Sequence, residues 1–70
     1  MNRNKLLGKI KENGFTIETV ARLTGMSLST LSRKLNGHVE FTRDEINAIS
    51  DALKMSNEDL MEIFFNEKVS

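Results

Sequence analysis

Residues 16 to 37 of the chain read TIETVARLTGMSLSTLSRKLNG. In this stretch, Gly25 and Gly37 each follow a short segment whose aliphatic residues recur at helical spacing. A glycine just past such a segment can adopt the left-handed conformation that ends a helix. The stretch therefore predicts two short helices, over residues 17–24 and 28–36, joined by a tight turn at Gly25.

One start signal recurs four times in the chain: an apolar residue, then a hydroxyl residue, then an aliphatic residue four positions after the hydroxyl. The hydroxyl oxygen can accept an unpaired backbone N–H in the first turn of a helix, and the apolar pair clamps the incoming chain. The four hydroxyl residues are Thr16, Ser27, Thr42 and Ser56. Thr42 and Glu45 form a capping box, and Ser56 and Asp59 approximate one.

These signals predict an all-α fold in one domain over residues 1–70. The expected helices cover about 4–13, 17–24, 28–36, 43–54 and 57–66. No segment alternates with a period of two for long enough to form a strand. The expected core consists of the apolar residues on the inner stripe of each helix, which are Leu6, Leu7, Ile10, Val20, Ala21, Leu23, Leu31, Leu35, Ile46, Ile49, Leu53, Leu60, Ile63 and Phe64.

The charges of the chain balance overall but are separated along it. Residues 1–43 carry eight basic and three acidic residues, whereas residues 44–70 carry two basic and seven acidic ones. The formal charge is therefore +5 in the first part and −5 in the second. A polyanion would be attracted to the first part and repelled by the second. The alternative interpretation is that these charges only cover solvated helix surfaces.

Several classes of protein are not expected from this composition. The chain has no cysteine, so it can form neither a disulfide nor a thiolate metal site. No apolar run is long enough to span a bilayer, and the N-terminus lacks the apolar segment of a signal peptide, which favours a cytoplasmic protein. The single histidine, His38, follows a helix end, and no nucleophile is spaced to pair with a base. We expect no enzyme, no cofactor, no metal and no small-molecule substrate.

The second helix of the opening stretch has a candidate binding face. A helix pair of this spacing is the unit that many small regulators insert into the major groove of DNA. With Leu31 and Leu35 buried, the 3.6-residue period exposes the opposite side of the second helix. That side carries Ser29, Ser32, Arg33 and Asn36, with Ser27 and Leu28 at its start and Lys34 at its flank. Arg33 can bind a guanine edge through two hydrogen bonds. An ordinary solvated polar face is the alternative.

A family resemblance rests on Thr16, Ala21, Gly25, Leu31 and the Asn36–Gly37 ending. These residues resemble the helix-turn-helix of the phage repressor and Cro class, the XRE-type regulators. The resemblance covers residues 4–54, and the remainder is similar to short phage regulators of low-GC Gram-positive hosts. It implies a five-helix, λ-repressor-like bundle in a bacterial host cell. The implied base contacts are Leu28, Ser29, Ser32 and Arg33, and the expected phosphate contacts are Thr16, Ser27, Lys34, Asn36 and Arg43.

Two positions depart from the pattern of this family. Ile17 stands where these proteins usually carry glutamine, and Leu28 occupies a first reading position that is commonly polar. We expect these two aliphatic side chains to lie close together on the DNA-facing side. There they could contact a thymine methyl group or form a small apolar patch for a partner protein.

Two functional hypotheses follow. The first is a sequence-specific DNA-binding transcription regulator of a phage lysis/lysogeny-type switch, which docks as a symmetric dimer on a double-stranded operator. The second is an antirepressor that binds a partner repressor through its helix-turn-helix face. Arg33, Asn36 and Arg43 favour the first, whereas Ile17, Leu28 and the zero net charge favour the second.

The last predicted helix raises the question of a homodimer. Leu60 and Phe64 form one apolar ridge, and Met61 and Phe65 form a second ridge about 100° round the helix. A domain of this size has little core to cover both ridges. We therefore predict that Met61 or Phe65 joins a dimer contact, and the alternative is that both fold under the first helix.

Overall fold

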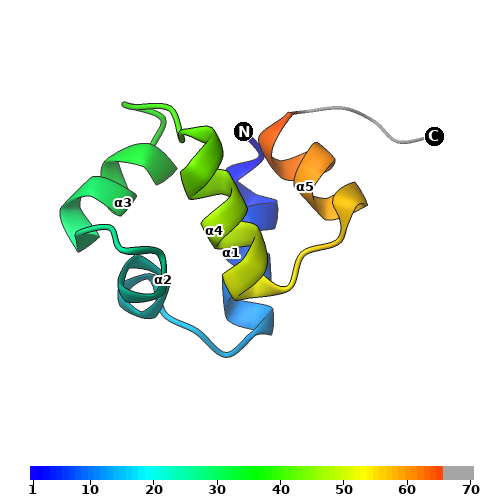
Figure 1. The fold of residues 1–70 in the computed structure, drawn as a ribbon, viewed down its shortest axis with the longest axis horizontal. Helices are drawn as coiled ribbons and strands as arrows, with labels where there is room; N and C mark the ends of the chain where they lie inside the picture. Colours follow the sequence, from blue (N-terminus) through cyan, green and yellow to red (C-terminus); the bar gives the residue numbers. More distant parts are fainter. Residues whose placement is uncertain (66–70) are drawn as a thin grey trace.

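The computed structural model describes residues 1–65. It contains α1 (Arg3–Glu12), α2 (Ile17–Thr24), α3 (Leu28–Leu35), α4 (Arg43–Leu53) and α5 (Asn57–Phe64), and no strand within that range. The all-α prediction is confirmed. In Figure 1, α2 and α3 lie at one end of the molecule and α5 lies at the other, with α4 between them. The predicted end of the last helix at residue 66 lies outside the described residues.

All four predicted capping residues act as N-caps. The Thr16 and Ser27 side chains accept from the backbone N–H groups of Thr19 and Thr30, at 3.2 and 3.1 Å. The capping boxes that begin α4 and α5 are both complete. A fifth cap was not predicted: the Asn2 side chain accepts from Lys5 N–H, so α1 begins at Arg3.

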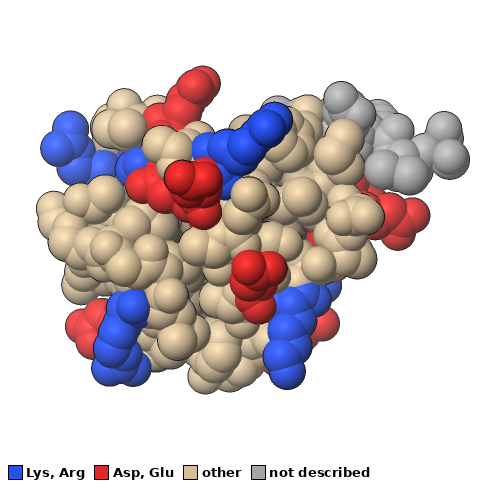
Figure 2. Space-filling view, in the orientation of Figure 1, with Lys and Arg blue, Asp and Glu red and all other residues tan. Residues whose placement is uncertain are grey.

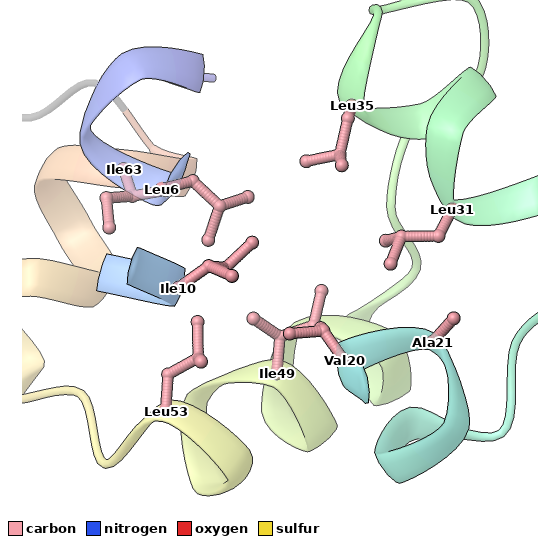
Figure 3. Close-up of a cluster of buried hydrophobic side chains, with 9 residues drawn as sticks. All are labelled: Leu6, Ile10, Val20, Ala21, Leu31, Leu35, Ile49, Leu53 and Ile63. Atoms are coloured by element: carbon pink, nitrogen blue, oxygen red, sulfur yellow. The ribbon is translucent and has the colours of Figure 1, made fainter. Parts of the chain in front are cut away.

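Nine buried side chains form one core to which all five helices contribute, as Figure 3 shows. Each was predicted from its spacing; they are Leu6, Ile10, Val20, Ala21, Leu31, Leu35, Ile49, Leu53 and Ile63. Leu7, Ile46, Leu60 and Phe64 are half-buried. The prediction that Leu23 is a core residue is wrong, because it is 54% exposed. The buried side of α2 carries Val20 and Ala21, and the helical rotation places Leu23 beyond its edge.

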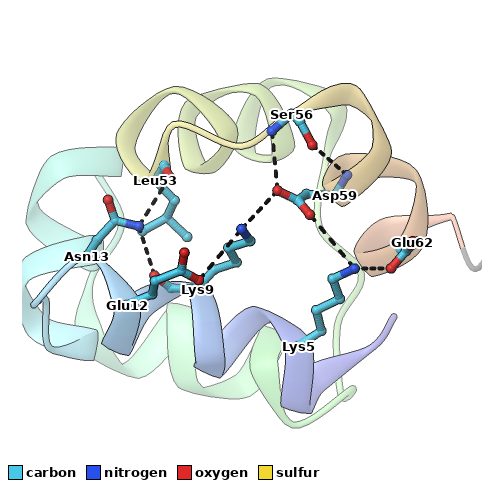
Figure 4. Close-up of polar contacts among 8 residues, drawn as sticks. All are labelled: Lys5, Lys9, Glu12, Asn13, Leu53, Ser56, Asp59 and Glu62. Atoms are coloured by element: carbon cyan, nitrogen blue, oxygen red, sulfur yellow. Dashed lines mark hydrogen bonds and ion pairs between the residues drawn. The ribbon is translucent and has the colours of Figure 1, made fainter.

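Polar contacts fasten α5 to α1, as Figure 4 shows. Lys9 Nζ lies 2.9 Å from Asp59 Oδ2, and Lys5 Nζ pairs with Glu62 and lies 3.8 Å from Asp59 Oδ1. The backbone N–H of Asn2 donates to the Ile63 carbonyl at 2.6 Å. Two lysines of the basic part of the sequence are therefore paired with acidic residues of α5.

The contact between Lys9 and Asp59 shifts the pKa values of both residues. The hydrogen bond from Lys9 holds the pKa of the Asp59 carboxyl below its ordinary value, and the same contact raises the pKa of Lys9.

Within residues 1–65, no helix is both long and apolar enough to cross a membrane.

Candidate nucleic-acid interface

The turn between α2 and α3 has the geometry that its sequence predicts. Gly25 adopts the left-handed conformation with φ of 74°. The Met26 N–H donates to the Ala21 carbonyl at 2.9 Å, and the Thr24 hydroxyl donates to the Val20 carbonyl at 2.7 Å. The first bond satisfies a carbonyl that the end of a helix leaves unpaired, and the second ties the Thr24 side chain to the last turn. The small side chain of Ala21 is buried at this crossing and allows α3 to pack closely on α2.

The packing of α3 fixes which of its sides faces solvent. Leu31 and Leu35 are buried, so the opposite side carries exposed Ser29 and Arg33. Leu28, at the first position of the helix, is 44% exposed. Ser32 is half-buried at the edge of this side. We call Leu28, Ser29, Ser32 and Arg33 the reading face.

The predicted phosphate contacts Thr16 and Ser27 stand at the N-termini of α2 and α3. Both are exposed, but their side-chain oxygens are already engaged as caps. The Ser27 hydroxyl also donates to the Thr30 hydroxyl oxygen at 2.8 Å. A phosphate at either position would also meet the first-turn N–H groups that the caps leave unpaired.

Lys34, a predicted phosphate contact, lies buried and not on the exposed surface. Its side chain is buried, with the residue only 8% exposed, and its ammonium pairs with Glu45 Oε1. The same carboxylate oxygen accepts the backbone N–H of Thr42 at 2.8 Å. The hydrogen bond from Lys34 is the main cause that lowers the pKa of Glu45, and the Thr42 N–H adds to it. The sequence shows no sign of this pairing, because the partners are eleven residues apart on different helices.

Asn36 and Arg43 stand at the two ends of the loop between α3 and α4. Asn36 is the exposed C-cap of α3, and Arg43 is the exposed first residue of α4. His38, in the loop itself, is also exposed. Arg33 and Arg43 form no ion pair with any residue of the described range 1–65.

The two residues of the predicted apolar patch, Ile17 and Leu28, differ in exposure. Ile17 is half-buried and packs against the core, whereas Leu28 is broadly exposed. The exposed patch predicted for a partner protein is therefore reduced mainly to Leu28. Figure 2 shows that the visible surface over α2 and α3 is largely uncharged, with both basic and acidic side chains at its margins.

A hollow of about 360 Å³ lies beside the reading helix, between the α3–α4 loop, the start of the chain and the end of α5. The Phe41 and Phe64 rings within its lining meet edge to face, with their centroids 5.4 Å apart. Three of the exposed large apolar residues also line it; these are Met1, Val39 and Phe65. Of the two predicted dimer residues, Phe65 is 50% exposed and Met61 is half-buried. Met1 and Val39 lie outside any helical stripe, so periodicity could not indicate them.

A family model described as the Cro/C1-type HTH DNA-binding domain matches residues 5–66. The chain therefore belongs to this family, and it is an XRE-like helix-turn-helix regulator that binds DNA. Searches of the curated proteins and of the solved structures returned no significant match.

Proposed function

We propose that the protein is a sequence-specific transcription regulator whose helix α3 reads the major groove of an operator. The observation that carries this proposal is the burial of Leu31 and Leu35, which leaves Ser29 and Arg33 on the solvent side of a short helix. Helices presented in this way by a helix-turn-helix contact base edges through their first turns.

The reading face suggests a role for each of its side chains. Arg33 donates two hydrogen bonds to a guanine, and Leu28 contacts a thymine methyl group. Ser29 and Ser32 can each donate or accept one hydrogen bond, so they discriminate less. Around this face, phosphates meet the starts of α2 and α3 at Thr16 and Ser27, the end of α3 at Asn36, and the start of α4 at Arg43.

We further propose that two copies bind a near-palindromic site through a symmetric contact. The support is the hollow lined by Met1, Val39 and Phe65, because a closed twofold contact needs one self-complementary patch. Sedimentation tests this contact with Phe65→Ala. The matched control is Leu23→Ala, which removes an equally exposed apolar side chain from α2. The proposal requires Phe65→Ala alone to weaken the dimer, and a wild-type protein that stays monomeric at high micromolar concentration contradicts it.

We place this regulator in the cytoplasm of a bacterial cell, in a phage lysis/lysogeny-type switch. The support is the resemblance of the chain to short phage regulators. A larger repressor gene, transcribed divergently beside the gene for this protein, would support the placement.

A second function is favoured by the low charge of the reading face. Of its four residues, Arg33 is the one charged side chain, and Leu28 exposes aliphatic surface. An antirepressor would use this surface to bind a partner repressor. Leu28→Glu would then abolish binding to the repressor of a neighbouring gene, and wild-type protein would prefer no DNA sequence.

The experiment that separates the two functions starts from a library of randomised DNA duplexes. Wild-type protein selects its preferred duplex, and fluorescence anisotropy then compares this duplex with a scrambled one over a range of salt concentrations. A regulator binds the selected duplex more tightly, and its affinity falls steeply with salt because phosphate contacts release counterions. Equal affinity for both duplexes at low salt overturns the regulator proposal.

A further inference from the structure

The buried pair of Lys34 and Glu45 lies between two elements that the proposed function places on DNA. Lys34 follows the reading residue Arg33 on α3, and Glu45 lies two positions after Arg43 on α4. The helices α3 and α4 both pack extensively against α2. The Lys34–Glu45 contact therefore links the two helices directly, in addition to the loop that joins them.

The Glu45 carboxylate connects three parts of this region through one oxygen. Its Oε1 atom accepts from the Lys34 ammonium and from the Thr42 N–H at the end of the α3–α4 loop. The Glu45 backbone N–H in turn donates to Thr42 Oγ1 at 3.2 Å, which completes the capping box of α4. The end of the reading helix, the end of the loop and the start of α4 are thus held in one arrangement.

We propose that Lys34 and Glu45 are positioning residues that set the orientation of the reading helix relative to the start of α4. The proposal rests on the proposed function, in which Arg33 contacts a base and Arg43 contacts a phosphate. Neither Lys34 nor Glu45 touches DNA in this account. Their contact keeps the two arginines at the separation that a matched operator requires, so the pair contributes to specificity.

Two opposite expectations make this proposal testable with Glu45→Gln. Simple electrostatics predicts that removing an acidic group beside DNA strengthens binding, because a repulsion is lost. The positioning role predicts that binding to the selected duplex weakens. Glutamine is the conservative choice, because it can still accept from Thr42 N–H in a capping box.

The matched control is Asp44→Asn, which removes the neighbouring carboxylate from the same turn of α4. Asp44 is exposed and forms no ion pair within residues 1–65, so its removal reports electrostatics alone. Lys34→Met forms the other half of the test, because it removes the ammonium and retains much of the buried stem. Circular dichroism at the binding temperature establishes that each variant is folded. If one single variant unfolds, the double variant Lys34→Met/Glu45→Gln is measured instead, because it leaves no unpaired buried charge.

The measurement is the anisotropy-derived affinity for the selected and scrambled duplexes, over a range of salt concentrations. We expect Glu45→Gln and Lys34→Met each to lower the ratio of the two affinities by about tenfold. We expect Asp44→Asn to leave this ratio unchanged and to strengthen both affinities slightly. A lost phosphate contact would lower the slope of log affinity against log salt concentration by about one. Because Lys34 makes no phosphate contact in this proposal, we expect Lys34→Met to keep the wild-type slope.

Three results would overturn the proposal. In the first, Glu45→Gln behaves like Asp44→Asn. In the second, Lys34→Met lowers the slope of log affinity against log salt concentration by about one. In the third, Glu45→Gln and Lys34→Met both keep the wild-type ratio of the two affinities. Each of these leaves the proposed function standing, because the wild type still prefers the selected duplex. If the wild type shows no such preference, the proposed function fails and the positioning role fails with it.

Discussion

At the α1–α5 end of the molecule, Lys5 and Lys9 are paired with Asp59 and Glu62, whereas at the α2–α3 end Arg33 pairs with no residue of the described chain. The first set of charges holds one helix to another. At the second end, the scaffold bonds are made by caps, by the turn at Gly25 and by the buried Lys34–Glu45 pair. A count of basic residues therefore overstates the positive charge that is available to DNA. The position of a basic side chain on the fold decides whether it can contact DNA.

The largest effect is expected when the two sides of α3 are compared with the same substitution. Leu31→Ala should lower the free energy of unfolding by about 2–5 kcal/mol, because Leu31 is fully buried. Leu28→Ala should change it by less than about 0.5 kcal/mol, because Leu28 is exposed. Urea unfolding measures both values. Similar losses for the two variants would show that the reading face has been placed on the wrong side of the helix.

The second comparison removes one positive charge from each end of the molecule. Arg33→Ala should weaken binding to the selected duplex by about 1–3 kcal/mol and relax the preference at one base pair. Lys9→Ala removes a charge that is already paired with Asp59, so its effect on DNA affinity should be much smaller. Anisotropy titrations of both variants test this difference. Equal losses of affinity would mean that the reading face has no special role.

A third comparison concerns the two turns. Gly25 after α2 and Lys54 after α4 both have positive φ, at 74° and 52°, and Lys54 is the one residue other than glycine with positive φ among residues 1–65. Because a side chain strains this conformation, Lys54→Gly should stabilise the protein by about 0.5–1 kcal/mol.

Gly25→Ala is the matched control for the turn comparison. It should destabilise the protein by about 1 kcal/mol, and the cause is the backbone, because a Cβ atom there meets nothing within 4 Å. Thermal unfolding compares both variants with the wild type. Loss of stability in Lys54→Gly would contradict the strain assigned to this turn.

The smallest effect is expected from the acidic residues that fasten α5. The pKa of Asp59 is lowered in the folded protein. Its ionised carboxyl therefore adds to the free energy of unfolding above about pH 4, the ordinary range of carboxyl pKa values. This stabilisation is lost as the pH falls through the lowered pKa. Asp59→Asn should therefore cost about 0.2–1 kcal/mol near neutral pH. It should also flatten the dependence of stability on pH in the acid range. Urea unfolding at several pH values measures this, and a pH dependence like that of the wild type would contradict it.

The parts of the fold that follow from local patterns could be predicted from the sequence. Caps such as Thr42, the turn at Gly25 and the buried side of α3 depend on residues within a few positions of one another. The roles of long polar side chains could not be predicted in this way. Lys34 was expected on the surface, but its length allows it to reach Glu45 on another helix. Lys9 and Asp59 are fifty residues apart in the sequence, and they meet because α5 packs on α1.

The most direct test of the central claim compares the two ends of the molecule in one experiment. Isotope-labelled wild-type protein is titrated with its selected duplex, and the backbone amide signals are followed by NMR. We expect the largest shifts on Ser29, Ser32 and Arg33 and at the start of α2 and α4, with small shifts along α1 and α5. Largest shifts at Lys5, Lys9 and α5, with an unchanged α3, would contradict it.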